Sequence, residues 1–299
     1  MSLYSDKIRE ATEQAIETLS KRGTIDKTVF WLGNTRQVTR IPNDVKSEFL
    51  ANRAFGDWAE ELIRSSINNE QNMFTAVKYG NSEKILAGEE GFKEFYLNQK
   101  DDVKKWGKRP DLLVYNRGEE PFLDMSPHRT ELMVENVKKS LFSMEVRSSK
   151  MLALEYIRVK EERKKGKSLS HHDFPSITIK IEDLKVVYDW LCIHDTPQYY
   201  VQVFLDSVYV IDFLKILNIL ANGKHYRVIR SKNSQNKPTI MVPISFATRV
   251  DTGFTLPEFE VAMRYNSLGR LDTYVKPSGG SVDLDLTSVL NDISAWKKE

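Results

Sequence analysis

The sequence predicts an α/β fold in which a mixed β-sheet core is flanked by helices and carries inserted loops. Short β-prone segments alternate with segments whose apolar residues recur at helical spacing, which is typical of this class. A chain of 299 residues, 40% of them hydrophobic, can bury a substantial core. We see no repeat and no low-complexity linker, so we expect a single domain with long loops.

Helices are predicted where apolar residues form one stripe. The longest such pattern is residues 44–67, in which Phe55, Trp58 and Leu62 share a face. The remaining predicted helices cover residues 3–21, a segment after Arg147 that ends near Gly166, a segment that begins near Glu182, and residues 214–221.

Strands are predicted in the short segments rich in β-branched and aromatic residues. In chain order these are residues 73–80, 110–115, 142–147 and 176–181, two strands within 198–213 that turn near Asp206–Ser207, and residues 225–230 and 239–250. A turn at 276–281 interrupts the mixed pattern of the last fifty residues.

Composition narrows the class of protein. Lysine and arginine number 44 against 42 acids, so the charge of +2 gives no overall basic signature, although one basic cleft can still bind nucleic acid. Cys192 is the only cysteine, which excludes an intramolecular disulfide and fits a reducing compartment. The first residues lack a signal-peptide pattern, and no apolar run approaches the roughly 20 residues that span a bilayer. We therefore expect a soluble, cytoplasmic protein.

The segment MEVRSSK, residues 144–150, contains the strongest candidate for a chemical site. Strand alternation places Glu145 and Arg147 on one face. A second acid, Asp111, stands after a proline at the start of an apolar strand. A charge in such a stretch is unfavourable without a partner or a metal, and Mg²⁺ prefers carboxylate and carbonyl oxygens. Together the two acids favour a cation site, although either alone is more often a solvent-facing residue.

Other acids are candidates for the same site. Glu60 lies on the flank of the 44–67 helix, whereas Glu61 points more to the other side, and a solvated helix face explains either one taken alone. The 34 positions between Asp111 and Glu145 require an inserted loop and helix. That insertion contains Asp124, an alternative first acid, but the strand behind Asp111 favours Asp111.

The order of these motifs resembles a known group of nucleases. A helix with Gly56 four positions before Glu60, a proline and Asp111 before a strand, and Glu145-x-Arg147 on the next strand resemble the PD-(D/E)XK nuclease superfamily. The stretches MEVRSSKMLALEYI and VVYDWLCIHDTPQYYVQVFLDSVYVIDF are similar to type II restriction endonucleases, in particular those grouped with AccI. The resemblance covers residues 50–215 and implies a restriction-endonuclease-like fold.

The resemblance also implies an activity and its residues. Such enzymes are homodimers that read a short palindrome in double-stranded DNA and cut each strand with Mg²⁺, leaving a 5′-phosphate and a 3′-hydroxyl. On this chain Asp111 and Glu145 match the metal-binding acids. The backbone carbonyl of Val146 would be a further ligand, and Glu60 matches an auxiliary acid.

Arg147 departs from the pattern, because the resemblance implies lysine at this position. A guanidinium stays protonated, so Arg147 can stabilise charge on a phosphate but cannot act as a general base. Lys150, three residues further on, is therefore the next candidate for a catalytic or phosphate-binding role. Ser148 and Ser149 stand at the strand-to-helix junction, where hydroxyl and N–H groups can bind phosphate oxygens.

The segment 224–238 is the candidate element for reading DNA bases. It contains six basic residues and no acid, and arginine and lysine suit guanine edges whereas asparagine and glutamine suit adenine. A flexible polar hairpin loop would have a similar composition. The residues we expect to contact DNA here are Arg227, Arg230, Lys232, Asn233, Gln235 and Asn236.

We expect one nuclease domain over residues 1–299. Within it, residues 1–45 would form a helical extension, 50–215 the catalytic core, and 216–299 the elements for DNA recognition and dimerisation. Two other functions fit the same residues. One is a DNA-binding protein with a degenerate nuclease fold, which Arg147 favours, and the other is a structure-specific repair nuclease. The simplest alternative is a globular α/β protein whose acids only face solvent.

Overall fold

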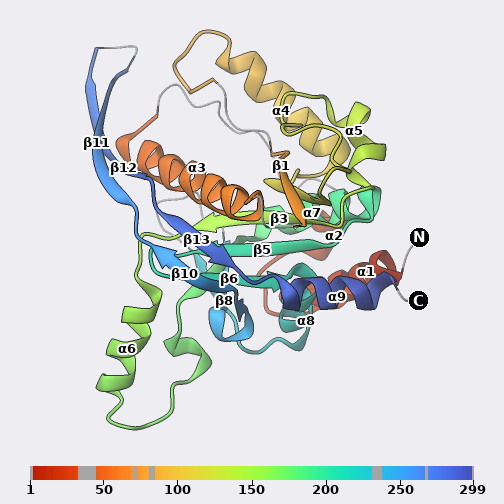
Figure 1. Ribbon diagram of the computed structural model, residues 1–299. Coiled ribbons are helices and arrows are strands. Elements are labelled where there is room, and N and C mark those ends of the chain that lie inside the picture. Colours follow the sequence, from red (N-terminus) through yellow and green to blue (C-terminus); the bar gives the residue numbers. More distant parts are fainter. Residues whose placement is uncertain are drawn as a thin grey trace.

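The computed structural model describes residues 3–32, 45–69, 73–80, 85–230, 238–266 and 269–297. A six-stranded mixed sheet forms its centre and helices cover both faces, which confirms the predicted α/β class (Figure 1). No helix within these ranges is both long enough and apolar enough to cross a membrane.

The central sheet has the strand order β1-β2-β3-β5-β6-β9. The strands are β1 (Phe74–Lys78), β2 (Leu112–Asn116), β3 (Phe142–Ser148), β5 (Gln198–Val203), β6 (Val208–Asp212) and β9 (Thr248–Arg249). β3 and β5 run parallel, and the other neighbouring pairs are antiparallel. A parallel pair needs a long crossover, which here consists of α6 (Ala153–Arg163), β4 (Ser176–Lys180) and α7 (Ile181–His194).

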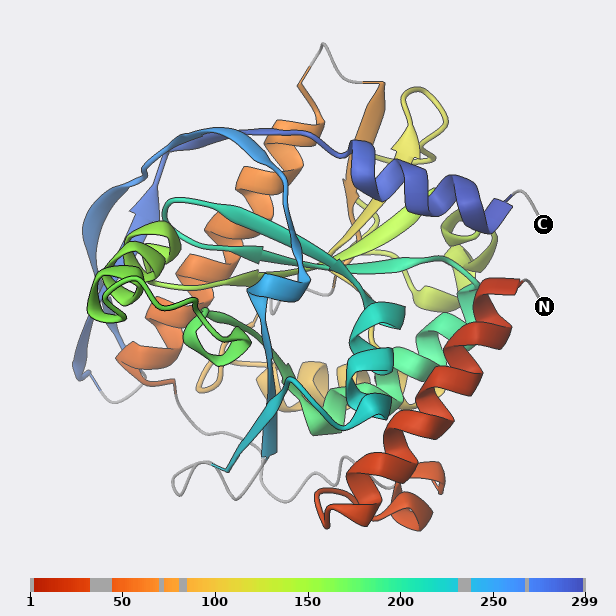
Figure 2. The ribbon, with the colours of Figure 1, turned by 90° about the horizontal axis from the view of Figure 1, so that it is seen from below.

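Each face of the sheet packs in its own apolar layer. One layer joins strand residues such as Met144 and Val146 to α3 (Ser47–Ile67) and α9 (Thr287–Lys297). The other joins strand residues such as Tyr200 to α1 (Leu3–Lys21), α7 and α8 (Phe213–Asn222). Figure 2 shows α1 and α9 on opposite sides of the sheet.

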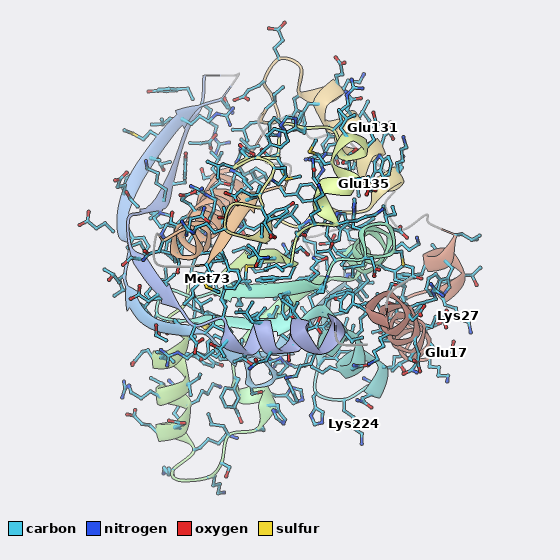
Figure 3. The ribbon with its side chains drawn as sticks, turned by 45° about the vertical axis from the view of Figure 1, so that its right-hand side comes forward. Glu17, Lys27, Met73, Glu131, Glu135 and Lys224 are labelled. Carbon is cyan, nitrogen blue, oxygen red and sulfur yellow. The ribbon has the colours of Figure 1, made fainter. Side chains whose placement is uncertain are left out.

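The helix assigned to an N-terminal extension is part of the core. Ile8, Ala15, Ile16 and Leu19 of α1 are almost fully buried, and the helix packs against α8 and α7. An ion pair of 2.8 Å between Glu17 and Lys27 ties α1 to the short helix α2 (Lys27–Trp31), and Figure 3 shows the two side chains together.

Three α-helices of the described chain were not expected from the sequence. They are α2, α4 (Phe92–Trp106) and α9, and the helix expected in the insertion between β2 and β3 is α5 (Thr130–Val137). Phe92 is the buried residue of α4, whose remaining sequence is mostly charged and polar. Phe95 and Tyr96 of the same helix are only partly buried, so α4 packs in a small apolar cluster and not in the layers of the central sheet.

The expected strand 239–250 is wrong as a single element. It divides into β8 (Pro238–Pro243), which pairs with β4 and β7 (Arg227–Arg230), and β9 in the central sheet. Pro243 ends β8 and a short 3₁₀ turn, Ile244–Phe246, follows it. Proline has no N–H for a ladder, so the chain changes sheets there.

The C-terminal region forms two further antiparallel pairs. β10 (Asp251–Thr255) pairs with β13 (Ser281–Leu284), and β11 (Glu258–Tyr265) pairs with β12 (Leu271–Ser278). The β11–β12 hairpin projects along one edge of the molecule beside α3 (Figure 1).

Candidate active site

Asp111 lies where β2 and β3 separate. Their antiparallel ladder ends at the pair Leu112 and Met144. Beyond it the Asp111 carboxylate accepts a hydrogen bond of 2.7 Å from the Val146 N–H. The Asp111 carbonyl accepts another, of 2.9 Å, from Tyr79. The Asp111 side chain is thereby held beside the middle of β3.

Glu145 and Arg147 point from β3 toward α7, on one face as expected. The Glu145 side chain is only 2% exposed, and its Oε1 lies 2.9 Å from Arg147 Nη2. The Lys108 ammonium contacts the same oxygen. Asp183 of α7 completes the group, with its Oδ2 3.5 Å from Arg147 Nη2 and 4.0 Å from Lys108 Nζ.

Lys108 and Asp183 were missed by the sequence analysis, although each carries a weak signal. Lys108 stands three positions before Asp111, in the same short segment between α4 and β2. Asp183 shares the helical stripe of Val187 and Trp190, which are buried, and a charge on an apolar stripe needs a partner. Neither signal identifies Glu145 as the partner, because that contact joins distant segments.

Negative charge is concentrated around Asp111. Burial, followed by the charge of Glu145 and then of Glu60, raises the pKa of Asp111 well above its usual value. Burial and the charge of Asp57 raise the pKa of Glu60 to about 7. For Arg147, burial is the largest single influence and opposes the charged form, but Glu145, Tyr200, Asp183 and Asp111 together outweigh it and raise the pKa. Acids that disfavour one another's ionisation are typical of a site that accepts a cation.

The atoms that could bind a cation here are carboxylate oxygens, which a hard divalent cation prefers. Glu145 Oε2 is buried and finds no hydrogen-bond donor among the described residues, so it can accept a ligand. Within those same residues, no three Asp, Glu, His or Cys side chains are gathered around one point. A Mg²⁺ site does not require three, because this ion commonly uses one or two carboxylates together with water and substrate phosphate.

The structure does not bring Lys150 to this group. Its ammonium lies over the ring of Phe55 on α3, 5.0 Å from the ring centre. Ser148 ends β3, and the Ser149 N–H donates to the Val203 carbonyl at 2.9 Å. Both serines are half-buried at the strand exit.

The two alternative acids lie apart from Glu145. Glu61 faces outward on α3, where it accepts hydrogen bonds from Arg64 and Ser65. Asp124 is exposed, forms an isolated β-bridge with Lys78, and accepts a hydrogen bond from the Ser126 N–H at 2.8 Å. Asp111 is therefore the acid that the fold places against β3.

The predicted DNA-reading segment is described only in part. Arg227 is exposed on β7, and Arg230 is the last residue of that strand. Lys232, Asn233, Gln235 and Asn236 lie outside the described residues.

Comparison with protein families gives one match that extends over most of the chain. The family model described as AccI restriction endonuclease matches residues 3–166 and 155–298. The comparisons with curated proteins and with solved structures give no match.

Proposed function

Because the chain belongs to the AccI restriction endonuclease family, whose activity is site-specific cleavage of double-stranded DNA, we propose a Mg²⁺-dependent, homodimeric type II enzyme with its active site at Asp111 and Glu145. It would hydrolyse a phosphodiester in each strand of a short palindrome and leave 5′-phosphates. The main support is the Asp111 carboxylate, which is held against β3 beside the buried Glu145.

In this proposal Asp111, Glu145 and the Val146 carbonyl bind the cation. A divalent cation in such a site polarises the scissile phosphate and lowers the pKa of the attacking water. The Val146 N–H orients Asp111, so the hydrogen bond at 2.7 Å fixes one ligand relative to the strand that bears the other two. Glu60 would be an auxiliary acid, since burial and nearby charge keep its pKa near 7.

Arg147 would stabilise negative charge on the phosphate. Its side chain is 26% exposed with Nε and Nη2 buried, so an incoming phosphate would reach it through Nη1, while Glu145 and Asp183 hold the guanidinium in place. Arginine keeps its proton and donates charge-assisted hydrogen bonds to phosphate oxygens. The proton of the attacking water must therefore pass to solvent, to the substrate phosphate or to another side chain.

DNA would be held on both sides of the strand exit. Ser148 ends the catalytic strand and Ser149 and Lys150 follow it directly, so we assign them contacts with the DNA backbone. Arg227 and Arg230 on β7, with Lys232, Asn233, Gln235 and Asn236, would read bases.

The β11–β12 hairpin is the surface that supports a homodimer. Its cross-strand register places eight residues without a charge on one face, and the exposed apolar side chains of that face are Phe259, Val261, Met263, Tyr265, Leu271 and Val275. They expose about 600 Å² together, near the upper limit for a monomer. Two copies would bury about 1,200 Å², the lower bound of a stable interface. A face without lysine or arginine does not suit the phosphate backbone.

Incubation with mixed-sequence duplex DNA tests the function. Wild-type protein with Mg²⁺ should give discrete fragments whose ends accept ligation without added phosphate. Binding without cutting in both Mg²⁺ and Mn²⁺ would instead support the degenerate DNA-binding protein. A smear that Asp111→Ala does not remove would refute the assignment. Sedimentation of wild type beside Met263→Glu tests the dimer, which the glutamate should disrupt.

A further inference from the structure

Glu145 has two cationic neighbours, and they differ in how firmly they are held. Arg147 is on the same strand, and one of its nitrogens lies within 3.5 Å of both Glu145 and Asp183. Lys108 reaches Glu145 from the loop that follows α4, and its side chain is 23% exposed. A lysine ammonium on a flexible four-carbon chain can leave Glu145 by rotation of its own side chain, whereas the Arg147 guanidinium is paired closely with both Glu145 and Asp183.

The backbone of Lys108 is fixed by the packing of its segment against α7. The Lys108 N–H donates to the Val186 carbonyl on α7 at 2.8 Å. Gly107 before it has φ +78°, and a Cβ there would lie 2.3 Å from the backbone nitrogen of Trp190. This close approach requires glycine and holds the Lys108 backbone beside the site.

We propose that Lys108 is a displaceable counter-ion of Glu145, whose ammonium neutralises this carboxylate until a divalent cation binds and must leave Oε1 when it does. The proposal rests on the metal site of the proposed function. It makes Lys108 a competitor of the metal in the free protein, in contrast to a lysine that only supports the site.

Asp183 gives the displaced ammonium a second position. Its Oδ2 is already 4.0 Å from Lys108 Nζ, and the carboxylate is 4% exposed. The ammonium can therefore shift from Glu145 toward Asp183. The metal then compensates the charge of Glu145, and Asp183 compensates that of Lys108. Such a short movement keeps Lys108 beside the place where a phosphate would bind. The displaced ammonium would then stabilise negative charge on the phosphate during cleavage.

Metal affinity without DNA tests the competition. We would titrate Mn²⁺ into wild type, Lys108→Met and Lys108→Gln by calorimetry at one ionic strength. Both neutral variants should bind Mn²⁺ about tenfold more tightly, because a unit charge next to the metal ligand is removed. Lys108→Arg retains the charge and should remain within a factor of about two of wild type. Lys105→Met is the matched control, since Lys105 is exposed, pairs with Glu131 at 3.5 Å, and should not change the affinity.

The direction of the change separates this role from structural support. Loss of a supporting residue weakens metal binding, so an unchanged or weaker affinity in the two neutral variants would overturn the proposal. The second readout is single-turnover cleavage, which should slow in Lys108→Met although the metal binds more tightly. Cleavage at or above the wild-type rate would refute the contact of Lys108 with the phosphate, but not its competition with the metal.

Failure of the proposed function gives a different result. If Glu145→Gln abolishes Mn²⁺ binding and Lys108→Met leaves it unchanged, the metal site stands and the counter-ion is refuted. If wild type, Lys108→Met and Lys108→Gln all fail to bind Mn²⁺, both proposals are wrong. If only the neutral variants bind measurably, the competition is stronger than expected and the counter-ion role is supported.

Discussion

Replacing Glu60 with glutamine should stabilise the folded protein at alkaline pH and leave it unchanged at acidic pH. Burial and the charge of Asp57 raise the pKa of Glu60 from 4.5 to about 7. Between these values the folded protein holds a proton that the unfolded chain releases. Wild-type stability therefore falls as pH rises through this window, and the Glu60→Gln variant lacks this fall because glutamine does not titrate.

The magnitude follows from the size of the pKa shift. A difference of one pKa unit corresponds to about 1.4 kcal/mol, so the shift of Glu60 gives up to about 3 kcal/mol above pH 7 and almost nothing at pH 4.5. Neighbouring Glu61 provides the control, because its hydrogen bond with Arg64 lowers its pKa. Glu61→Gln should therefore lose a few tenths of a kcal/mol at alkaline pH.

Urea denaturation without divalent cations measures the effect. Wild type, Glu60→Gln and Glu61→Gln would be compared at pH 4.5, 6 and 8.5. The free energy of unfolding of Glu60→Gln should exceed that of wild type at pH 8.5 and match it at pH 4.5. An equal difference at all three values, or a loss of stability at pH 8.5, would refute the assignment of a strained carboxylate at Glu60.

Three other substitutions test the site and its support. Asp111→Asn should reduce cleavage by about 10³-fold, because a cation ligand is lost. Duplex binding, measured by anisotropy in Ca²⁺, should stay intact, and a parallel loss of binding would contradict this prediction. Arg147→Lys should slow single-turnover cleavage about tenfold, because one ammonium cannot pair with Glu145 and Asp183 and also contact the phosphate as a guanidinium can. A faster enzyme would support a degenerate nuclease fold. Gly107→Ala should destabilise the fold by about 3 kcal/mol or more in thermal unfolding. The new Cβ would lie 2.3 Å from the backbone nitrogen of Trp190 and 2.5 Å from the carbonyl oxygen of Val186. An unchanged melting temperature would disprove this close approach.

Local patterns were sufficient for the elements that carry the acids. The apolar stripe of Phe55, Trp58 and Leu62 predicts α3, and these residues are buried in it. Alternation on β3 predicts that Glu145 and Arg147 share a face. The two side chains do form an ion pair, and Arg147 also contacts Asp183. These features depend on residues that are close in sequence, which is why the chain alone reveals them.

Long-range contacts were beyond the same patterns. Lys108 reaches Glu145 over 37 positions, and no periodicity encodes that distance. The β11–β12 hairpin is a different case, because residues 258–265 alternate between polar and apolar side chains and this local strand signal was missed. The split of 239–250 between two sheets also depends on partners elsewhere in the chain.

Anomalous diffraction from crystals containing Mn²⁺ tests the central claim most directly, because it locates the cation without reference to activity. A peak within coordination distance of the Asp111 and Glu145 carboxylates, with the Val146 carbonyl as a third protein ligand, is the result we expect. The same crystals of Asp111→Asn should lose or weaken that peak. A peak bound by other residues, with Lys108 still on Glu145, would contradict the active site proposed for this protein.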